Sequence, residues 1–169
     1  MDNKMREVRL EKLVVNIGSG SEQGPQENAR KLLTLITGRN PANEISRTRN
    51  PSFHIAKGQK IGAYVTVRGD EAKKLLARLL GAVSNRIKES SITDNSVSFG
   101  IREYIDINGV KYDPKIGMLG MNVNMSFGRP GRRISLRKRA RGRVSDGHRI
   151  VTKEEIKEYL KHNFKVESV

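Results

Sequence analysis

An arginine-rich tract between Arg129 and Arg143 carries the densest potential chemistry in the chain. It holds eight basic residues and no acidic one: Arg129, Arg132, Arg133, Arg137, Lys138, Arg139, Arg141 and Arg143. Guanidinium groups suit bidentate contact with phosphate and stacking on bases. A solvated surface segment is the alternative, but seven Arg among eight bases favour nucleic-acid contact. Because glycine and proline interrupt the tract, residues 128–149 are predicted to form an extended basic arm or loop that orders on a partner.

A second, milder enrichment of basic residues lies between Arg39 and Lys60. Its five bases face a single acidic residue, and they are Arg39, Arg47, Arg49, Lys57 and Lys60. Phe53 and His54 stand among them on a loop rich in Asn, Pro and Gly. Bases interleaved with an aromatic side chain can hold unpaired nucleotides. Packing of Phe53 into the core is the competing interpretation.

Catalytic and metal-binding patterns are weak by comparison. The glycines Gly18, Gly20 and Gly24 follow a predicted strand, but their spacing does not fit the dinucleotide-binding fingerprint. The three histidines are scattered, and no Walker-type phosphate loop occurs. With no cysteine in the chain, thiol catalysis, disulfides and Cys-ligated metals are excluded. We therefore expect neither an enzyme nor a bound metal or cofactor.

The overall charge points to a polyanionic partner. The 169 residues include 33 Lys and Arg against 18 Asp and Glu, a formal net charge of +15, of which the Arg-rich tract supplies +8. Nucleic acid is the commonest reason for such an excess, ahead of an acidic membrane surface or protein. No apolar run is long enough to span a bilayer. These features predict a soluble, intracellular protein with no membrane partner.

Hydrophobic periodicity predicts the elements that would position these residues. Alternating residues predict strands over Val8–Ile17, Asn43–Thr48 and Ile61–Arg68. Helical spacing predicts a helix ending at Gly38 and a second, capped by Asp70, whose apolar stripe runs from Ala72 through Val83 to Ile87.

The second half of the chain favours short strands. They are predicted over Ser96–Ile101, Tyr104–Ile107, Val110–Tyr112 and Met121–Phe127, with Asn108-Gly109 as a hairpin turn. Thr152 and Glu155 form a predicted capping box for a last helix packed through Ile156, Tyr159 and Leu160.

Together these elements predict a single α+β domain over residues 1–169 with a largely antiparallel sheet. Three amphipathic helices would cover one face of that sheet. The other face would carry polar residues suited to a polar partner, and these are Asn16, Tyr64, Thr66, Arg68, Asn122, Asn124 and Ser126.

Five motifs, in order along nearly the whole chain, carry a family resemblance. They are Lys12–Gly18 (KLVVNIG), Ile61–Gly69 (IGAYVTVRG), Phe99–Glu103 (FGIRE), Lys111–Gly117 (KYDPKIG) and Gly128–Gly131 (GRPG). The chain resembles the universal large-subunit ribosomal protein five family. The Arg-rich insertion and the GRPG start resemble its archaeal type.

The resemblance implies a structural component of the large ribosomal subunit that works in the cytoplasm, in the ribosome. It implies binding of 5S rRNA and of large-subunit rRNA in the central protuberance. It also implies contact with P-site tRNA, with other large-subunit proteins of the 5S particle, and with a small-subunit head protein across the intersubunit bridge.

The family's binding residues carry over by position. The resemblance assigns 5S rRNA contacts to Asn16, Arg39, Phe53 and Thr66. Arg39 departs from the Gln typical of bacterial members, so a phosphate contact could replace a specific hydrogen bond there. A tRNA-facing loop over residues 50–60 would present His54, Lys57 and Gly58.

Phosphate affinity would come from the bases around the polar face and from the arm. Beyond the Arg-rich tract, the candidates are Arg47, Arg49 and Arg68.

Two other functions stay open: a general RNA chaperone or extraribosomal RNA-binding regulator, and an enzyme acting on RNA. A chaperone would bind many RNAs with similar affinity, and an enzyme would need a cofactor or acid–base pocket that the sequence does not offer.

Overall fold

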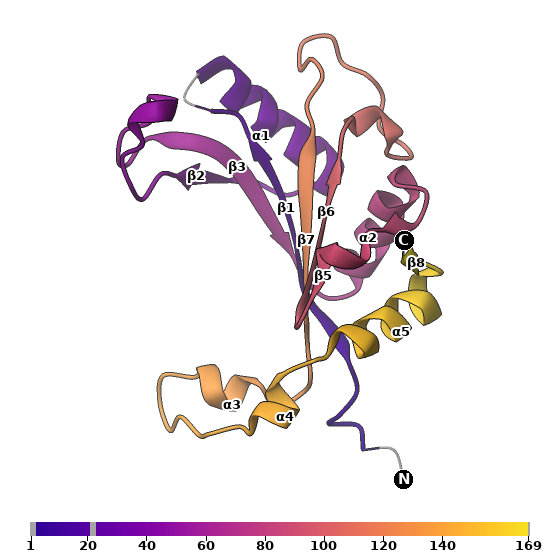
Figure 1. Ribbon diagram of the computed structural model, residues 1–169. Helices are drawn as coiled ribbons and strands as arrows, with labels where there is room; N and C mark the ends of the chain where they lie inside the picture. Colours follow the sequence, from indigo (N-terminus) through magenta and orange to yellow (C-terminus); the bar gives the residue numbers. More distant parts are fainter. Residues whose placement is uncertain (1–2, 21–22, 169) are drawn as a thin grey trace.

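A six-stranded antiparallel sheet organises the computed structural model, which describes residues 3–20 and 23–168 (Figure 1). The strand order is β2-β3-β1-β7-β6-β5. The strands are β1 (Arg9–Gly18), β2 (Ala42–Ile45), β3 (Lys60–Val67), β5 (Ile92–Thr93), β6 (Ser96–Ile101) and β7 (Met121–Gly128). The N-terminal strand β1 lies between β3 and β7, so the sheet joins the two halves of the sequence. The predicted α+β architecture is confirmed.

The alternation of the central strands sets the two faces of the sheet. In β1, Leu13, Val15 and Ile17 are fully buried, while the residues between them are only half-buried. Val15 pairs with Val65 of β3 and with Val123 of β7, so one row of buried side chains crosses three strands. Period-2 spacing puts all of these side chains on one face.

Three helices cover that apolar face: α1 (Gln23–Thr37), α2 (Asp70–Ala82) and α5 (Lys153–Phe164) (Figure 1). Each buries a stripe at helical spacing, such as Leu75, Leu76 and Leu79 in α2. The capping box of α5 is confirmed, because the Thr152 side chain accepts from the Glu155 amide while the Glu155 carboxylate accepts from the Thr152 amide. The helices therefore leave the opposite face of the sheet uncovered.

The segment between β6 and β7 differs from its prediction. The expected strands Tyr104–Ile107 and Val110–Tyr112, with their hairpin, are wrong: the structure has a 3₁₀ turn, η3 (Tyr104–Asp106), followed by irregular chain. Tyr104, Ile107 and Val110 are buried at intervals of three, which fits successive tight turns and not a strand. The Tyr104 hydroxyl accepts from the Asp113 amide at 3.1 Å and so fixes this loop to the core.

The C-terminal end of α2 also differs from the sequence prediction. The helix stops at Ala82 because Ser84 and Asn85 take the left-handed conformation, with φ of +54° and +56°. Ile87 is therefore buried from a short strand, β4 (Arg86–Ile87), and not from the helix. That strand pairs in parallel with β8 (Glu167–Ser168), a contact that periodicity did not predict.

Two other local predictions are corrected. The cap of α2 is Gly69, with φ of +73°, and Asp70 is the first helical residue, with no side-chain cap bond. The predicted strand Asn43–Thr48 starts one residue earlier and ends at Ile45, where its pairing with β3 becomes irregular.

Four short helical elements complete the described chain. They are η1 (Pro51–Phe53), η2 (Glu89–Ser91), α3 (Arg133–Leu136) and α4 (Asp146–Arg149). The basic arm over residues 128–149 is thus only partly extended, since α3 and α4 each form one helical turn within it. In the described part of the chain, no helix is long and apolar enough to cross a membrane.

Candidate nucleic-acid interface

The uncovered face of the sheet presents rows of side chains that are mostly polar and uncharged. Cross-strand pairing puts Tyr64, Asn16 and Asn122 in one row over β3, β1 and β7. The adjacent row contains Thr66, Val14 and Asn124, and it extends to Ser98 of β6. Asn16 and Thr66, both assigned to RNA from the sequence, therefore lie on neighbouring strands of the same face.

Asn16 is held in place by a neighbour on β7. The Asn124 Nδ2 donates to Asn16 Oδ1 at 3.4 Å. With its oxygen engaged, Asn16 offers its amide NH₂ as a donor to a ligand, while Asn124 keeps its oxygen as an acceptor. Uncharged donors and acceptors of this kind bind through the geometry of their hydrogen bonds, and their contribution changes little with salt concentration.

A groove of about 720 Å³ lies along this face beside β2. Asn16, Tyr64 and Asn124 line it on the sheet side, and Arg47 lines it from the loop that follows β2. Tyr64 is 37% exposed, so its ring is available to stack. The groove thus combines amide and hydroxyl groups with apolar side chains, and its lining holds one carboxylate, Glu44, and one cation, Arg47.

The loop between β2 and β3 is built as an extension of that hairpin. Ser46 donates its amide to the Gln59 carbonyl at 2.8 Å, and the Gly58 amide donates to the Ser46 carbonyl at 2.9 Å. Farther out, Asn50 and Ile55 exchange both backbone hydrogen bonds. These bonds hold the predicted tRNA-facing loop in a defined shape.

The tip of this loop exposes the residues that the sequence singled out. Phe53 ends η1 and is 69% exposed, so the alternative of a core aromatic is wrong. His54 follows it with φ of +53°, and Lys57 and Gly58 are exposed as well. An exposed aromatic ring among cations is suited to stacking on a base.

Two of the eight bases of the tract form ion pairs within the protein. The Arg129 side chain is only 9% exposed, and its Nη2 pairs with Glu155 at 2.5 Å while its Nη1 donates to the Gly147 carbonyl at 2.7 Å. Arg132 pairs with Glu11 of β1 at 2.9 Å. These two residues fasten the arm to α5 and to the sheet, and a carboxylate lies beside each guanidinium.

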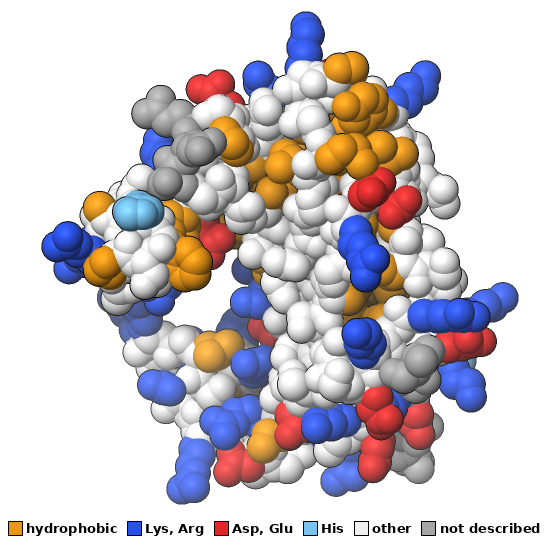
Figure 2. Space-filling model, turned by 45° about the horizontal axis from the view of Figure 1, so that its top comes forward, with side chains coloured by type: hydrophobic (Ala, Val, Ile, Leu, Met, Phe, Trp, Pro, Cys, Tyr) orange, Lys and Arg blue, Asp and Glu red, His pale blue; other side chains and the backbone are white. Residues whose placement is uncertain are grey.

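The other six bases of the tract are exposed and form no ion pair with a described residue. They are Arg133, Arg137, Lys138, Arg139, Arg141 and Arg143. Arg47, Arg49 and Arg68 are exposed in the same way. Figure 2 shows Lys and Arg side chains around the hollow between the β2–β3 end of the molecule and the arm. Positive charge therefore surrounds a concave face that presents mainly amide and hydroxyl groups, with Lys12 of β1 and Glu44 of β2 as opposite charges on it.

Arg39 is separated from the other assigned residues. It follows α1, and its guanidinium pairs with Glu71 in the first turn of α2. This pair lies with the helices, whereas Asn16 and Thr66 lie on the opposite face of the sheet. The structure thus brings Asn16 and Thr66 together and leaves Arg39 with the helix layer.

Sequence reasoning left Ser98 out of the polar face. Ser98 of β6 is exposed and pairs with Asn124, which extends the second row by one strand. The alternation of Val97, Phe99 and Ile101 with serine and glycine could have predicted that Ser98 lies on the polar face.

Among the described residues, no cluster of three or more His, Asp or Glu side chains could hold a metal ion.

Comparison with known proteins identifies the family. Residues 3–55 match the model described as ribosomal protein L5, and residues 60–159 match the model of the C-terminus of the same ribosomal family. A relative from Sulfurisphaera tokodaii, named large ribosomal subunit protein uL5, is 44% identical over 97% of this chain and 93% of its own. Relatives of the same name from Methanosphaera stadtmanae and Nanoarchaeum equitans are 42% and 39% identical, and they are covered over 98% and 100% of their length.

Fold and relatives together define the class: this is a structural, non-enzymatic protein of the large ribosomal subunit, and it works in the cytoplasm as part of the ribosome. The chain belongs to the ribosomal protein L5 family. The resemblance carried by the five sequence motifs, including its archaeal character, is confirmed.

Proposed function

We propose that the polar sheet face binds 5S rRNA and that the arm helps to attach this RNA to large-subunit rRNA in the central protuberance. The observation that carries the proposal is the set of amide and hydroxyl side chains on the face over β3, β1 and β7, with exposed cations on either side of it. Phosphate contacts supply affinity for any RNA, whereas fixed neutral donors and acceptors distinguish one RNA from another.

The loop between β2 and β3 is the proposed contact with P-site tRNA. Its exposed His54, Lys57 and Gly58 would face the tRNA, while Phe53 at the same tip is the proposed stacking contact with 5S rRNA. Other large-subunit proteins of the 5S particle and a small-subunit head protein complete the proposed set of partners.

Binding of 5S rRNA is tested with a matched pair of threonine variants. Thr66→Ala removes a hydroxyl from the polar face, while Thr34→Ala removes one from α1 on the helix side, where it donates to the Arg30 carbonyl. Thr66→Ala should weaken 5S rRNA binding by about fivefold, the equivalent of one hydrogen bond of about 1 kcal/mol. The salt dependence of binding should not change, because no charge is removed.

The specific claim also requires discrimination between RNAs. The protein should prefer 5S rRNA to a tRNA in a filter-binding or anisotropy titration at moderate salt. Equal affinities for the two RNAs would instead favour the second function, a general RNA chaperone or extraribosomal regulator. An equal loss of binding in Thr66→Ala and Thr34→Ala would contradict the assignment of the polar face.

A further inference from the structure

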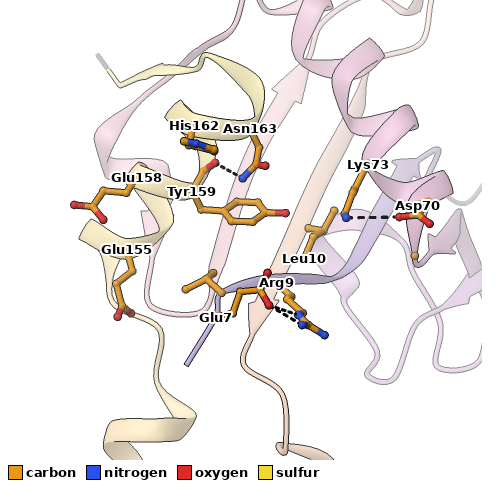
Figure 3. Close-up of a pocket in the computed structure, with 12 residues that line it drawn as sticks. Glu7, Arg9, Leu10, Asp70, Lys73, Glu155, Glu158, Tyr159, His162 and Asn163 are labelled. Carbon is orange, nitrogen blue, oxygen red and sulfur yellow. Dashed lines mark hydrogen bonds and ion pairs between the residues drawn. The ribbon is translucent and has the colours of Figure 1, made fainter. Parts of the chain in front are cut away.

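A second groove, of about 970 Å³, lies among the N-terminal half of β1, the first turn of α2 and the helix α5 (Figure 3). It differs from the polar face in both position and chemistry. α2 and α5 belong to the helix layer, so this groove opens on the side of the sheet that does not carry Asn16 and Thr66.

The floor of the groove is apolar and only partly covered. Val8, Leu10 and Tyr159 line it, and each packs against the core while remaining half-exposed. The Tyr159 ring lies edge-on to Phe127 with ring centroids 5.5 Å apart, and Figure 3 shows it reaching toward β1. Covering such apolar side chains would be favourable.

The charge of the groove is opposite to that of the molecule. Four carboxylates line it, those of Glu7, Asp70, Glu155 and Glu158, against only two Lys or Arg side chains. The whole chain carries +15. Glu7, Asp70 and Glu155 pair with Arg9, Lys73 and Arg129, whereas Glu158 forms no ion pair with a described residue. The groove therefore keeps a small net negative charge, which disfavours RNA phosphates and favours a cationic polypeptide.

The groove also borders a free strand edge. β1 begins at Arg9, but its pairing with β3 begins only at Leu13. Over residues 9–12, β1 therefore pairs with β7 alone, and its other edge forms no backbone hydrogen bond with the described chain. An open edge of this kind can accept an added strand.

We propose that this groove binds an extended segment of a neighbouring ribosomal protein that carries Lys or Arg together with apolar side chains. The segment pairs with the free edge of β1, covers Val8, Leu10 and Tyr159, and places a cation at Glu158. The proposal uses the place of the chain in the large subunit and does not depend on the proposed binding of 5S rRNA.

Site-specific photo-crosslinking in large subunits that contain the full-length chain tests the proposal. A photoreactive benzoylphenylalanine replaces His162, an exposed groove residue of α5. The matched control carries the same group in place of Lys153, which is exposed on the opposite side of this helix and does not line the groove. The groove position should crosslink to one ribosomal protein, through a peptide with more Lys and Arg than Asp and Glu, and the control should not.

A synthetic copy of the crosslinked peptide then measures the charge contribution. Its affinity for the full-length chain should fall about tenfold in Glu158→Lys and stay unchanged in Lys153→Glu. The proposal is overturned if the groove position crosslinks to rRNA or to nothing, if the captured peptide is acidic, or if both charge variants bind it equally.

Discussion

Six exposed bases in the arm should account for a large and separable part of the salt dependence of RNA binding. We consider a variant in which all six are replaced by Gln: Arg133, Arg137, Lys138, Arg139, Arg141 and Arg143. If each contacts one phosphate, the slope of log affinity against log salt should become less steep by about 4 to 5, at about 0.7 to 0.9 per contact.

The structure supplies a control inside the same tract. Arg129 and Arg132 are held by Glu155 and Glu11, so replacing both with Gln should change the slope by less than about 0.7, the share of one contact. The same double variant should lower the free energy of unfolding by about 2 kcal/mol. That is less than a fully buried pair would lose, because Glu155 is 37% exposed.

Fluorescence anisotropy over a range of KCl concentrations measures both slopes, with 5S rRNA and a large-subunit rRNA transcript as separate ligands. The six-base variant should lose slope on at least one of them. An unchanged slope with both RNAs would show that the six bases do not contact phosphates. A slope change in the Arg129 and Arg132 variant as large as that of two phosphate contacts would show that these two residues bind RNA as well.

Three further predictions concern the fold, and each is measured by urea unfolding. Gly62→Ala should destabilise the protein by about 1 to 3 kcal/mol, because the added Cβ would lie 2.5 Å from a backbone carbonyl oxygen of β1, and an unchanged midpoint would contradict this. Thr152→Ala should lower the free energy of unfolding by about 1 kcal/mol, because it removes the hydroxyl that accepts from the Glu155 amide. A loss of less than a few tenths of a kcal/mol would exclude this cap as a stabilising contact. The hydrogen bond and charge of Lys157 lower the pKa of Glu89 from its ordinary value of 4.5, so the Glu89 contribution to stability is present above pH 4.5 and is lost as the pH falls through the lowered pKa. The unmodified protein should therefore be more stable than the Glu89→Gln variant above pH 4.5, and this difference in the free energy of unfolding should shrink as the pH falls below 4.5. A difference that does not depend on pH would contradict a stabilising pair between Glu89 and Lys157.

The central strands were predictable because their burial is one-sided. In β1, β3 and β7 a period of two separates buried from polar residues, and this alternation depends only on local spacing. It was enough to place Asn16 and Thr66 on one face. The segment after β6 was not predictable in the same way, because Tyr104, Ile107 and Val110 reach the core through turns.

Other features depend on contacts between distant parts of the chain. The end of α2 has no Gly or Pro at the positions where the chain turns, since Ser84 and Asn85 take the left-handed conformation. In the sequence, Arg129 cannot be distinguished from the other bases of its tract. Only its ion pair with Glu155, 26 positions away, shows that its side chain is held within the protein. Spacing along the chain cannot reveal such a partner.

Direct contact between 5S rRNA and the polar face over β3, β1 and β7 can be tested by cleavage of the RNA from that face. The chain has no cysteine, so single cysteines can carry a tethered hydroxyl-radical source. Ser98→Cys places the source on the polar face, and Thr34→Cys places it on α1 at the opposite side of the sheet. In the complex with 5S rRNA, the account predicts strong, localised cleavage of the RNA from position 98 and little from position 34. Cleavage from position 34 alone, or equal cleavage from both, would contradict it.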